Sequence, residues 1–228
     1  MQANYGYEVH VNLTYQYNTL IIFTMAELIV VQGYPGSGKS TQSEQLVDET
    51  LDGRAVFHVS AGNRLREVRS GASDSRYAND INSPNAPSPL PDEVVNGVIF
   101  EAVESQNDSS LVLIDGYPRH PSAIDVFARY INKHEHDLLG VVNFNISLET
   151  SMQRVGTRGV RSGEKMRGAT LEELAIKRYR DHGRLTTNAL ELLGEYTSID
   201  HIDANDNQEI VWKRFRRTIG RLAINLNS

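Results

Sequence analysis

The chain has 228 residues, of which 39% are hydrophobic and 23% charged, and this composition is typical of a soluble globular protein. Twenty-three Lys and Arg against 29 Asp and Glu give a net charge of 23 − 29 = −6. Such an acidic chain is a poor binder of nucleic acid or anionic membranes, so we expect neither partner. The absence of Cys excludes disulfides, thiol catalysis and Cys-ligated zinc. It also fits the reducing cytoplasm, which is the localisation we expect.

The first 24 residues differ in composition from the rest of the chain. They carry one formally charged residue, Glu8, and the first basic residue is Lys39. A secretory signal or transit peptide needs an early basic region, which is missing here. We therefore predict that residues 1–24 are a disordered or non-native extension, with an additional edge strand as the alternative. Residues 25–228 are predicted to form one domain.

After Met25, short apolar runs alternate with longer helical stretches. The helices are expected near residues 39–51, 62–70, 92–105, 121–134, 149–158, 170–193 and 207–222. The strands are expected at residues 28–31, 55–59, 111–114, 141–146 and 196–202. Four of these runs are apolar without strict alternation, which is typical of parallel strands buried on both faces. The pattern predicts an α/β fold with a five-stranded parallel sheet and helices on both faces.

Two stretches of the chain lack the periodic pattern of a helix or a strand. Residues 71–91 are rich in Ser, Asn and Pro, and residues 159–169 are polar, basic and rich in Gly. Long irregular inserts in a compact domain are usually functional, so we expect both to be lids. Thr170 and Glu173 have the spacing of a capping box at the start of the longest helix. His134 and His136 are predicted to be surface residues rather than metal ligands.

The string GYPGSGKST at residues 33–41 fits the pattern G-x-x-x-x-G-K-[ST] between an apolar strand and a helix. Gly36 and Gly38 permit backbone angles that point successive N–H groups into one concave nest. The following helix adds its N-terminal dipole. Lys39 supplies a charge for the outer phosphates, and the Ser40 hydroxyl suits magnesium. The string predicts a phosphate-binding loop for a nucleoside triphosphate.

Asp115 ends the apolar run LVLID, and a carboxylate in that position lies beside a phosphate loop, where it holds magnesium largely through water. The alternative is a helix cap or turn residue. The nearest string to the guanine-reading motif N-K-x-D is NKHE at residues 132–135, which lacks the Asp. We therefore do not expect a GTPase.

Three further strings are HVSAGNRLR at residues 58–66, PDEVV at 91–95 and DGYPR at 115–119. Together with GYPGSGKST, their order and spacing resemble the adenylate kinases and close nucleoside monophosphate kinases, from about residue 25 to 222. The resemblance implies a P-loop kinase with an acceptor-binding insert at about 60–91 and a short, zinc-free lid at about 156–169. It also implies reversible transfer of the γ-phosphoryl group of ATP, with Mg²⁺, to a nucleoside monophosphate, by a monomeric enzyme.

The resemblance also assigns roles to individual residues. The residues expected to bind ATP are Gly33, Pro35, Gly36, Ser37, Gly38, Lys39, Ser40, Thr41, Arg154, Arg158 and Asn205. The residues expected to bind the monophosphate are Ala61, Arg66, Leu90, Gly116, Arg119, Arg167 and Arg178. Catalytic charge is expected from Lys39, Arg119, Arg154, Arg158, Arg167 and Arg178, and the magnesium site from Ser40 and Asp115.

Three departures from the family pattern leave alternatives open. Asn63 stands where the family usually has Asp, and Ala123 stands where adenylate kinases have Gln and pyrimidine kinases have Asn. Ala61 replaces the Thr of many adenylate kinases and resembles the pyrimidine kinases. AMP is the first expected acceptor, UMP or CMP the second. A nucleotide-binding regulator that has lost turnover is the alternative from another class. A kinase for a neutral acceptor is disfavoured, because it needs no second set of phosphate-binding arginines.

Overall fold

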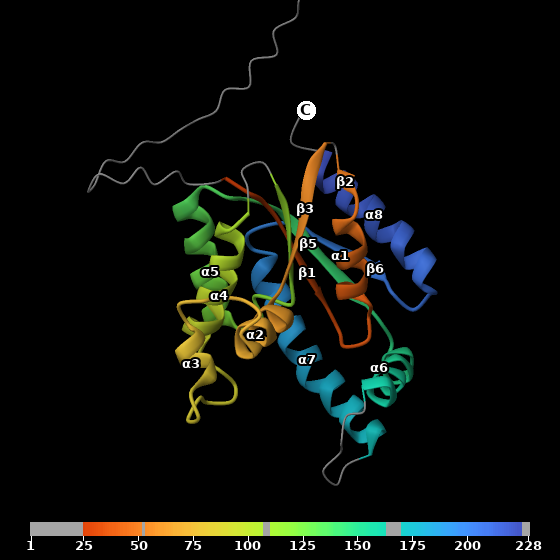
Figure 1. Cartoon of the computed structure of the whole chain (residues 1–228). Coiled ribbons are helices and arrows are strands. Elements are labelled where there is room, and N and C mark those ends of the chain that lie inside the picture. The colour runs from red at the N-terminus through yellow and green to blue at the C-terminus, as the bar shows by residue number, and fades with distance from the viewer. Residues whose placement is uncertain (1–24, 52, 107–109, 163–169, 225–228) are drawn as a thin grey trace, which may run out of the picture.

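The computed structural model describes residues 25–51, 53–106, 110–162 and 170–224 (Figure 1). The extension predicted at residues 1–24 lies outside these ranges. The strands are β1 (Glu27–Gly33), β2 (Thr50–Leu51), β3 (Arg54–Ser60), β4 (Leu111–Asp115), β5 (Asp137–Asn145) and β6 (Ile199–Asp203). The helices are α1 (Lys39–Val47), α2 (Ala61–Ser70), α3 (Ala78–Asn82), α4 (Asp92–Glu104), α5 (Pro121–His134), α6 (Leu148–Ser162), α7 (Leu171–Leu193) and α8 (Gln208–Ile224).

The strands form one sheet in the order β2-β3-β4-β1-β5-β6. All neighbouring strands pair in parallel except β2, which is antiparallel to β3. The predicted α/β class is therefore confirmed, but the predicted count of five strands is wrong, because the described sheet has six. The additional strand is only two residues long, which is too short to produce a periodic pattern in the sequence. It occupies the end of the predicted first helix, so α1 ends at Val47.

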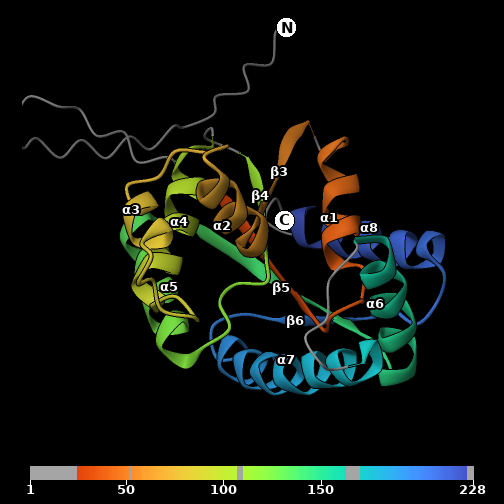
Figure 2. The same ribbon diagram turned by 60° about the horizontal axis from the view of Figure 1, so that its bottom comes forward.

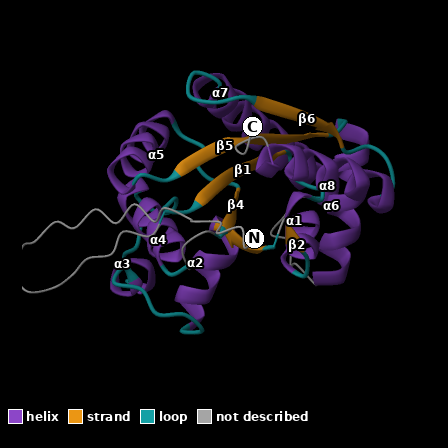
Figure 3. Cartoon of the chain, turned by 90° about the horizontal axis from the view of Figure 1, so that it is seen from above, coloured by secondary structure: helices purple, strands orange, loops and turns teal. Residues whose placement is uncertain are grey.

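The central strand β1 is buried on both faces. Leu28 and Val30 belong to one hydrophobic core, and Ile29 and Val31 belong to a second core on the opposite face. Because successive side chains of a strand point to opposite faces, both sets must be apolar. This is why the strand shows a continuous apolar run. Helices α4, α5 and α7 cover one face of the sheet, and α1 and α8 cover the other (Figure 3).

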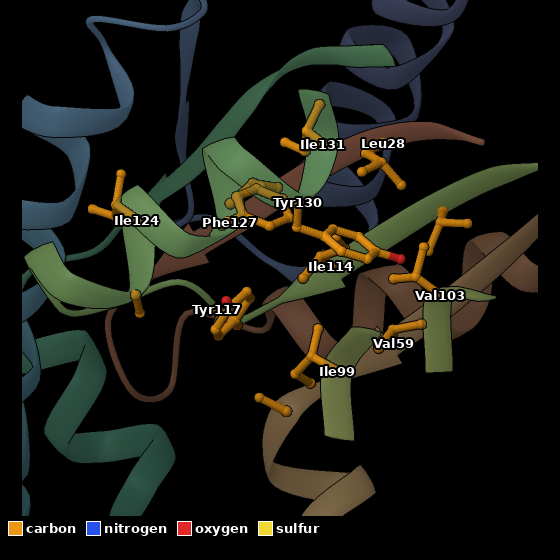
Figure 4. Close-up of a cluster of buried hydrophobic side chains, with 14 of the residues drawn as sticks. Leu28, Val59, Ile99, Val103, Ile114, Tyr117, Ile124, Phe127, Tyr130 and Ile131 are labelled. Atoms are coloured by element: carbon orange, nitrogen blue, oxygen red, sulfur yellow. The ribbon is translucent and has the colours of Figure 1, made fainter. Parts of the chain in front are cut away.

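The larger of these cores continues into the loop that follows β4 (Figure 4). Tyr117 packs edge-on against Phe127 of α5, with ring centroids 5.6 Å apart. Its hydroxyl donates a hydrogen bond of 2.9 Å to Asn96 Oδ1 of α4. A buried hydroxyl with a partner avoids the cost of an unsatisfied polar group. The loop after β4 is therefore anchored in the core, which positions the residues that follow it.

A third, smaller hydrophobic cluster connects α2 and α3 to α4. It consists of Val68, Ile81, Val94 and Val98, all of which are buried. The short helix α3 was not expected from the sequence, where this stretch is irregular. The cluster holds α2 beside the carboxyl end of β3, from which α2 begins directly.

The longest helix, α7, begins as predicted. The Thr170 side chain accepts a hydrogen bond of 3.1 Å from the Glu173 backbone, and the Glu173 carboxylate accepts one of 2.8 Å from the Thr170 backbone. This confirms the capping box predicted from the sequence. Neither α7 nor any other helix in the described ranges combines the length and the apolar character that crossing a bilayer requires.

Candidate active site

The predicted phosphate loop and the predicted metal carboxylate lie at one edge of the sheet. The parallel strands end there with Gly33, Ser60, Asp115, Asn145 and Asp203. The strand order reverses at β1, whose neighbours are β4 and β5. Ligands of open α/β sheets bind outside the carboxyl ends of the strands at such a switch point. Figure 2, in which this edge comes forward, has α2 and α3 to one side of it and α6 to the other.

The phosphate loop connects β1 to α1 without other secondary structure. Gly36 and Gly38 have φ angles of 77° and 86°, in the left-handed region that favours glycine. A side chain at Gly36 would also have its Cβ 3.0 Å from the Ser151 carbonyl of α6. Ser151 in turn donates from its hydroxyl to the Pro35 carbonyl, at 2.7 Å. The loop is thus held against α6, and its amides precede the N-terminus of α1, which is an arrangement that binds anions.

The serines and threonine of the loop differ in their surroundings. Ser37 is 1% exposed, and its hydroxyl oxygen has no hydrogen-bond partner among the described residues. Thr41 is exposed on the first turn of α1. Ser40 points to the neighbouring strand and donates a hydrogen bond of 2.5 Å to Asp115 Oδ2. The two residues predicted to hold magnesium are therefore in direct contact.

Asp115 ends β4 and is 3% exposed. Its Oδ2 atom also lies 3.3 Å from His58 Nε2. Burial by itself raises the pKa of Asp115, but hydrogen bonds from His58 and Ser40 and the nearby charge of Lys39 outweigh it and lower the pKa. Asp115 is therefore ionised at neutral pH. Its other oxygen, Oδ1, is buried and makes no hydrogen bond within the described ranges.

Sequence reasoning did not single out His58. It occurs in the string HVSAGNRLR, but nothing in that string distinguishes it from a packing residue. The parallel register of β3 against β4, with Ser60 opposite Asp115, brings the ring to the carboxylate.

Arg154 of α6 connects the phosphate loop to the segment between β6 and α8. Its guanidinium accepts nothing and donates to backbone carbonyls of both segments. The Nη1 atom donates to the carbonyls of Gly36, at 3.4 Å, and Ala204, at 2.9 Å. The Nη2 atom donates to the carbonyls of Asn205, at 3.3 Å, and Asp206, at 2.7 Å. The predicted ATP-binding residue Asn205 thus lies beside the predicted lid arginine.

Two hydrogen bonds hold the DGYPR loop against β1, one to the strand's backbone and one from a side chain of the strand. Gly116 donates from its backbone to the Val31 carbonyl at 3.0 Å, and Gln32 Nε2 donates to the Pro118 carbonyl at 2.7 Å. Gln32 is 1% exposed, so this contact is inside the protein. The loop that carries Arg119 is therefore tied to the same strand as the phosphate loop.

Arg119 folds back over this loop. A Cβ atom at Gly116 would lie 2.6 Å from Arg119 Nη2. The Nη1 atom lies 2.9 Å from Nδ1 of His182 on α7. Burial lowers the pKa of Arg119, and the charge of Asp115 opposes this effect. Within the described ranges, no carboxylate forms an ion pair with this guanidinium.

Of the remaining predicted acceptor residues, Ala61 and Arg66 are in α2, and Leu90 lies in the loop before α4. Arg66 Nη2 donates to Asn63 Oδ1, so the unusual Asn63 contacts the predicted phosphate-binding arginine. Leu90 packs against the third cluster. Ala61 and Ala123 are 8% and 3% exposed and belong to the larger core. Arg167 lies outside the described residues, as do the side chains of Arg158 and Arg178, whose backbones are in α6 and α7.

Comparison with known proteins agrees with this arrangement. A family model described as adenylate kinase matches residues 31–222. Adenylate kinase 1 of Schistosoma mansoni is 30% identical over 201 residues, which are 87% of this chain and 95% of that protein. The adenylate kinase of Bacteroides fragilis is 26% identical over 195 residues, 85% of this chain and 98% of the relative. That of Oenococcus oeni is 25% identical over 201 residues, 87% of this chain and 100% of the relative. The chain belongs to the adenylate kinase family and is a nucleoside monophosphate kinase.

Proposed function

We propose that this enzyme transfers the γ-phosphoryl group of ATP, with Mg²⁺, reversibly to a nucleoside monophosphate, and that AMP is its preferred acceptor. The observation that carries the proposal is the position of Arg119. Its half-buried guanidinium has the ring of His182 as its only hydrogen-bond partner among the described side chains. Its loop is tied to the strand that leads into the phosphate loop. A half-buried positive charge that forms no ion pair with a described carboxylate favours binding of an anion.

The donor site is assigned to the phosphate loop and to the segment held by Arg154. The backbone amides after Gly36 and Gly38 bind the inner phosphates, and Lys39 at the start of α1 contacts the outer ones. Asn205 and its neighbours line the side where the adenine binds. Because Arg154 donates to both segments, it holds the phosphate side and the base side of the donor site in one geometry.

The side chains at the end of β4 fit a magnesium ion. Asp115 is ionised, and its buried Oδ1 lacks a partner among the described residues. The hydroxyl of Ser40 lies next to it. Oxygen ligands of this kind are those that Mg²⁺ prefers, commonly with water between ion and carboxylate. When bound, Mg²⁺ neutralises charge on the β- and γ-phosphates.

The reaction needs no covalent intermediate. A phosphate oxygen of the acceptor attacks the γ-phosphorus, the bond to the bridging oxygen of the β-phosphate breaks, and ADP leaves with that electron pair. Catalysis then consists of positioning and of stabilising charge on the transferring group. Lys39 and the arginines perform this work. Arg119 and Arg66 bind the acceptor phosphate, and we assign Arg158, Arg167 and Arg178 to the transferring group.

UMP or CMP is the alternative acceptor, and Ala61 favours it, because alanine at this position resembles the pyrimidine kinases. Ala123 replaces both the Gln of adenylate kinases and the Asn of pyrimidine kinases, and it is buried in the larger core. It offers no polar atom to an adenine ring. Under the AMP proposal, the base is recognised by backbone groups and by the shape of the site.

A direct test measures ADP formation from ATP and Mg²⁺ with AMP, UMP, CMP, dCMP and GMP, each in turn, and with EDTA as the metal control. We expect the highest kcat/KM with AMP and no turnover with EDTA. Lys39→Met should lower turnover by about 10²- to 10⁵-fold. Lys213→Met is the matched control, because Lys213 is exposed on α8 and pairs only with Glu209 among the described carboxylates. A higher kcat/KM with UMP or CMP would contradict the proposed preference for AMP and assign the pyrimidine nucleotide as the acceptor. ATP binding without turnover on any monophosphate would overturn the proposal.

A further inference from the structure

We propose that His182 is a positioning residue of the acceptor site, which accepts a hydrogen bond from Arg119 and orients its guanidinium for the acceptor phosphate. This inference rests on the proposed function, since it assumes that Arg119 binds that phosphate. His182 belongs to none of the motifs through which the sequence resembles the family. It lies on α7, 63 residues further along the chain than its partner.

The contact defines the state of the imidazole ring. A guanidinium can only donate hydrogen bonds, so the Nδ1 atom at 2.9 Å from Arg119 Nη1 must be the acceptor. The ring proton is therefore on Nε2, and the ring is neutral. A carboxylate in this place would hold the arginine equally well but would cancel its charge. A neutral ring orients the guanidinium and leaves its positive charge for an incoming anion.

A second contact restricts the same guanidinium from the other end. The Nη2 atom lies over Gly116, where a Cβ atom would be only 2.6 Å away. Thus Nη1 is held by His182, and Nη2 occupies the space that a side chain at Gly116 would fill. Arginine has many rotamers, and holding it in one of them costs entropy. Because the guanidinium is already ordered before the acceptor binds, less entropy is lost on binding, and the preformed contacts should strengthen acceptor binding.

The face of α7 that carries His182 also contacts the phosphate loop. Tyr179 stacks on Tyr34 of that loop, with ring centroids 4.5 Å apart. Tyr34 also covers Gly183, where a Cβ atom would lie 2.5 Å from the tyrosine ring. Residues three and four positions apart on a helix share one face, so Tyr179, His182 and Gly183 lie together. One helix face therefore positions Arg119 relative to the donor loop.

The test compares three variants by steady-state kinetics, with ATP and with the monophosphate that the acceptor panel selects. His182→Phe keeps a planar ring but removes the acceptor atom, and His182→Asn keeps an acceptor oxygen close to the position of Nδ1. Asp181→Asn is the control, because Asp181 is exposed on the same turn and pairs with Lys177. We expect His182→Phe to raise the acceptor KM about tenfold with the ATP KM within twofold of the wild type. His182→Asn should stay within about threefold for the acceptor, and Asp181→Asn should match the wild type.

A second measurement does not depend on turnover. Long-range ¹H–¹⁵N correlation spectra of the wild-type protein should assign His182 as the neutral tautomer with its proton on Nε2. Three results would overturn the inference: a proton on Nδ1, an equal rise of both KM values in His182→Phe, or an equal acceptor defect in His182→Phe and His182→Asn. If the wild type turns over no monophosphate, the proposed function fails, and titration with AMP decides the inference. An unchanged affinity for AMP in His182→Phe would then overturn it.

Discussion

His58 on β3 and Asp115 on β4 meet inside the protein, with 3.3 Å between Nε2 and Oδ2 and side-chain exposures of 6% and 2%. A carboxylate so deeply buried is stable in its ionised form only when several groups stabilise the charge. Here the imidazole, the Ser40 hydroxyl and the Lys39 charge do so, and together they lower the pKa of Asp115 despite its burial. The same contacts orient the carboxylate toward the phosphate loop.

Replacing His58 tests this arrangement. We expect His58→Leu to lower the free energy of unfolding by about 1–3 kcal/mol, because it removes a hydrogen bond to a buried charged group. His58→Gln keeps a donor near the position of Nε2 and should recover part of the loss. Urea unfolding curves measure both effects. Equal midpoints for the wild type and His58→Leu would show that the contact contributes nothing to stability.

His136 makes stability depend on pH. It was expected at the surface, but it is 6% exposed, and its ring contacts the backbone of Ala26 at 3.2 Å and the hydroxyl of Tyr130 at 3.2 Å. Burial, with a smaller contribution from the nearby His134, lowers the pKa of His136 from 6.5 to about 4.

The direction of the pH effect follows from this shift. Between pH 6.5 and 4 the unfolded chain binds a proton at this histidine and the native state does not, so stability falls as the pH falls. We expect a loss of about 1–2 kcal/mol between pH 7 and 4.5, allowing for partial solvent screening. Urea unfolding at both pH values measures it. His136→Gln should show a smaller difference between the two pH values, and an equal difference would contradict the assignment.

Gly33 is required by the close approach of β1 to β5. Its φ is 148°, and a Cβ atom there would lie 2.8 Å from the backbone oxygen of Phe144. Backbone atoms cannot move away as a flexible side chain can, so we expect Gly33→Ala to lose about 2–4 kcal/mol of stability. Gly220→Ala is the control, because its Cβ would meet no described atom within 4 Å and its helix should gain up to about 1 kcal/mol. Thermal unfolding distinguishes the two, and equal melting temperatures would contradict the steric argument.

Arg154 should act through the shape of its guanidinium as well as its charge. A lysine keeps the charge but cannot donate to two segments at once from a planar fork. We expect Arg154→Lys to raise the KM for ATP about tenfold and to change the acceptor KM less than twofold. Arg221→Lys is the control, since this arginine pairs with Asp200 outside the candidate site. An unchanged KM for ATP would show that the bridging contacts are not needed for donor binding.

The contact between Ser40 and Asp115 is the part of the site that could be predicted most directly. Asp115 ends one apolar strand, and Ser40 follows another through the phosphate loop, and the carboxyl ends of parallel strands meet at one edge of a sheet. The contacts of Arg154 are different in kind. A resemblance assigned this arginine to ATP, but its hydrogen bonds to backbone carbonyls carry no signature in the side chains of residues 204–206.

Short elements were also beyond sequence reasoning. Strand β2 has two residues and helix α3 has five, and both are shorter than the stretch of sequence in which a helical or strand period can be recognised. Long elements were predicted well, because each repeats its pattern several times. The capping box at Thr170 was predictable for another reason, since both of its hydrogen bonds lie within four consecutive residues.

The amino-acid sequence by itself determined the phosphate loop, the carboxylate at the end of β4, the buried parallel strands and the family of the protein. These features depend on local spacing, on backbone freedom at glycines and on the apolar period of single elements. Only the tertiary structure decided that His58 contacts Asp115 and that His182 contacts Arg119. Such pairs depend on strand register and on the packing of α7 against the sheet. The free energy that fixes the register and the packing comes from contacts throughout the core, and no local pattern of residues encodes the sum of these contacts.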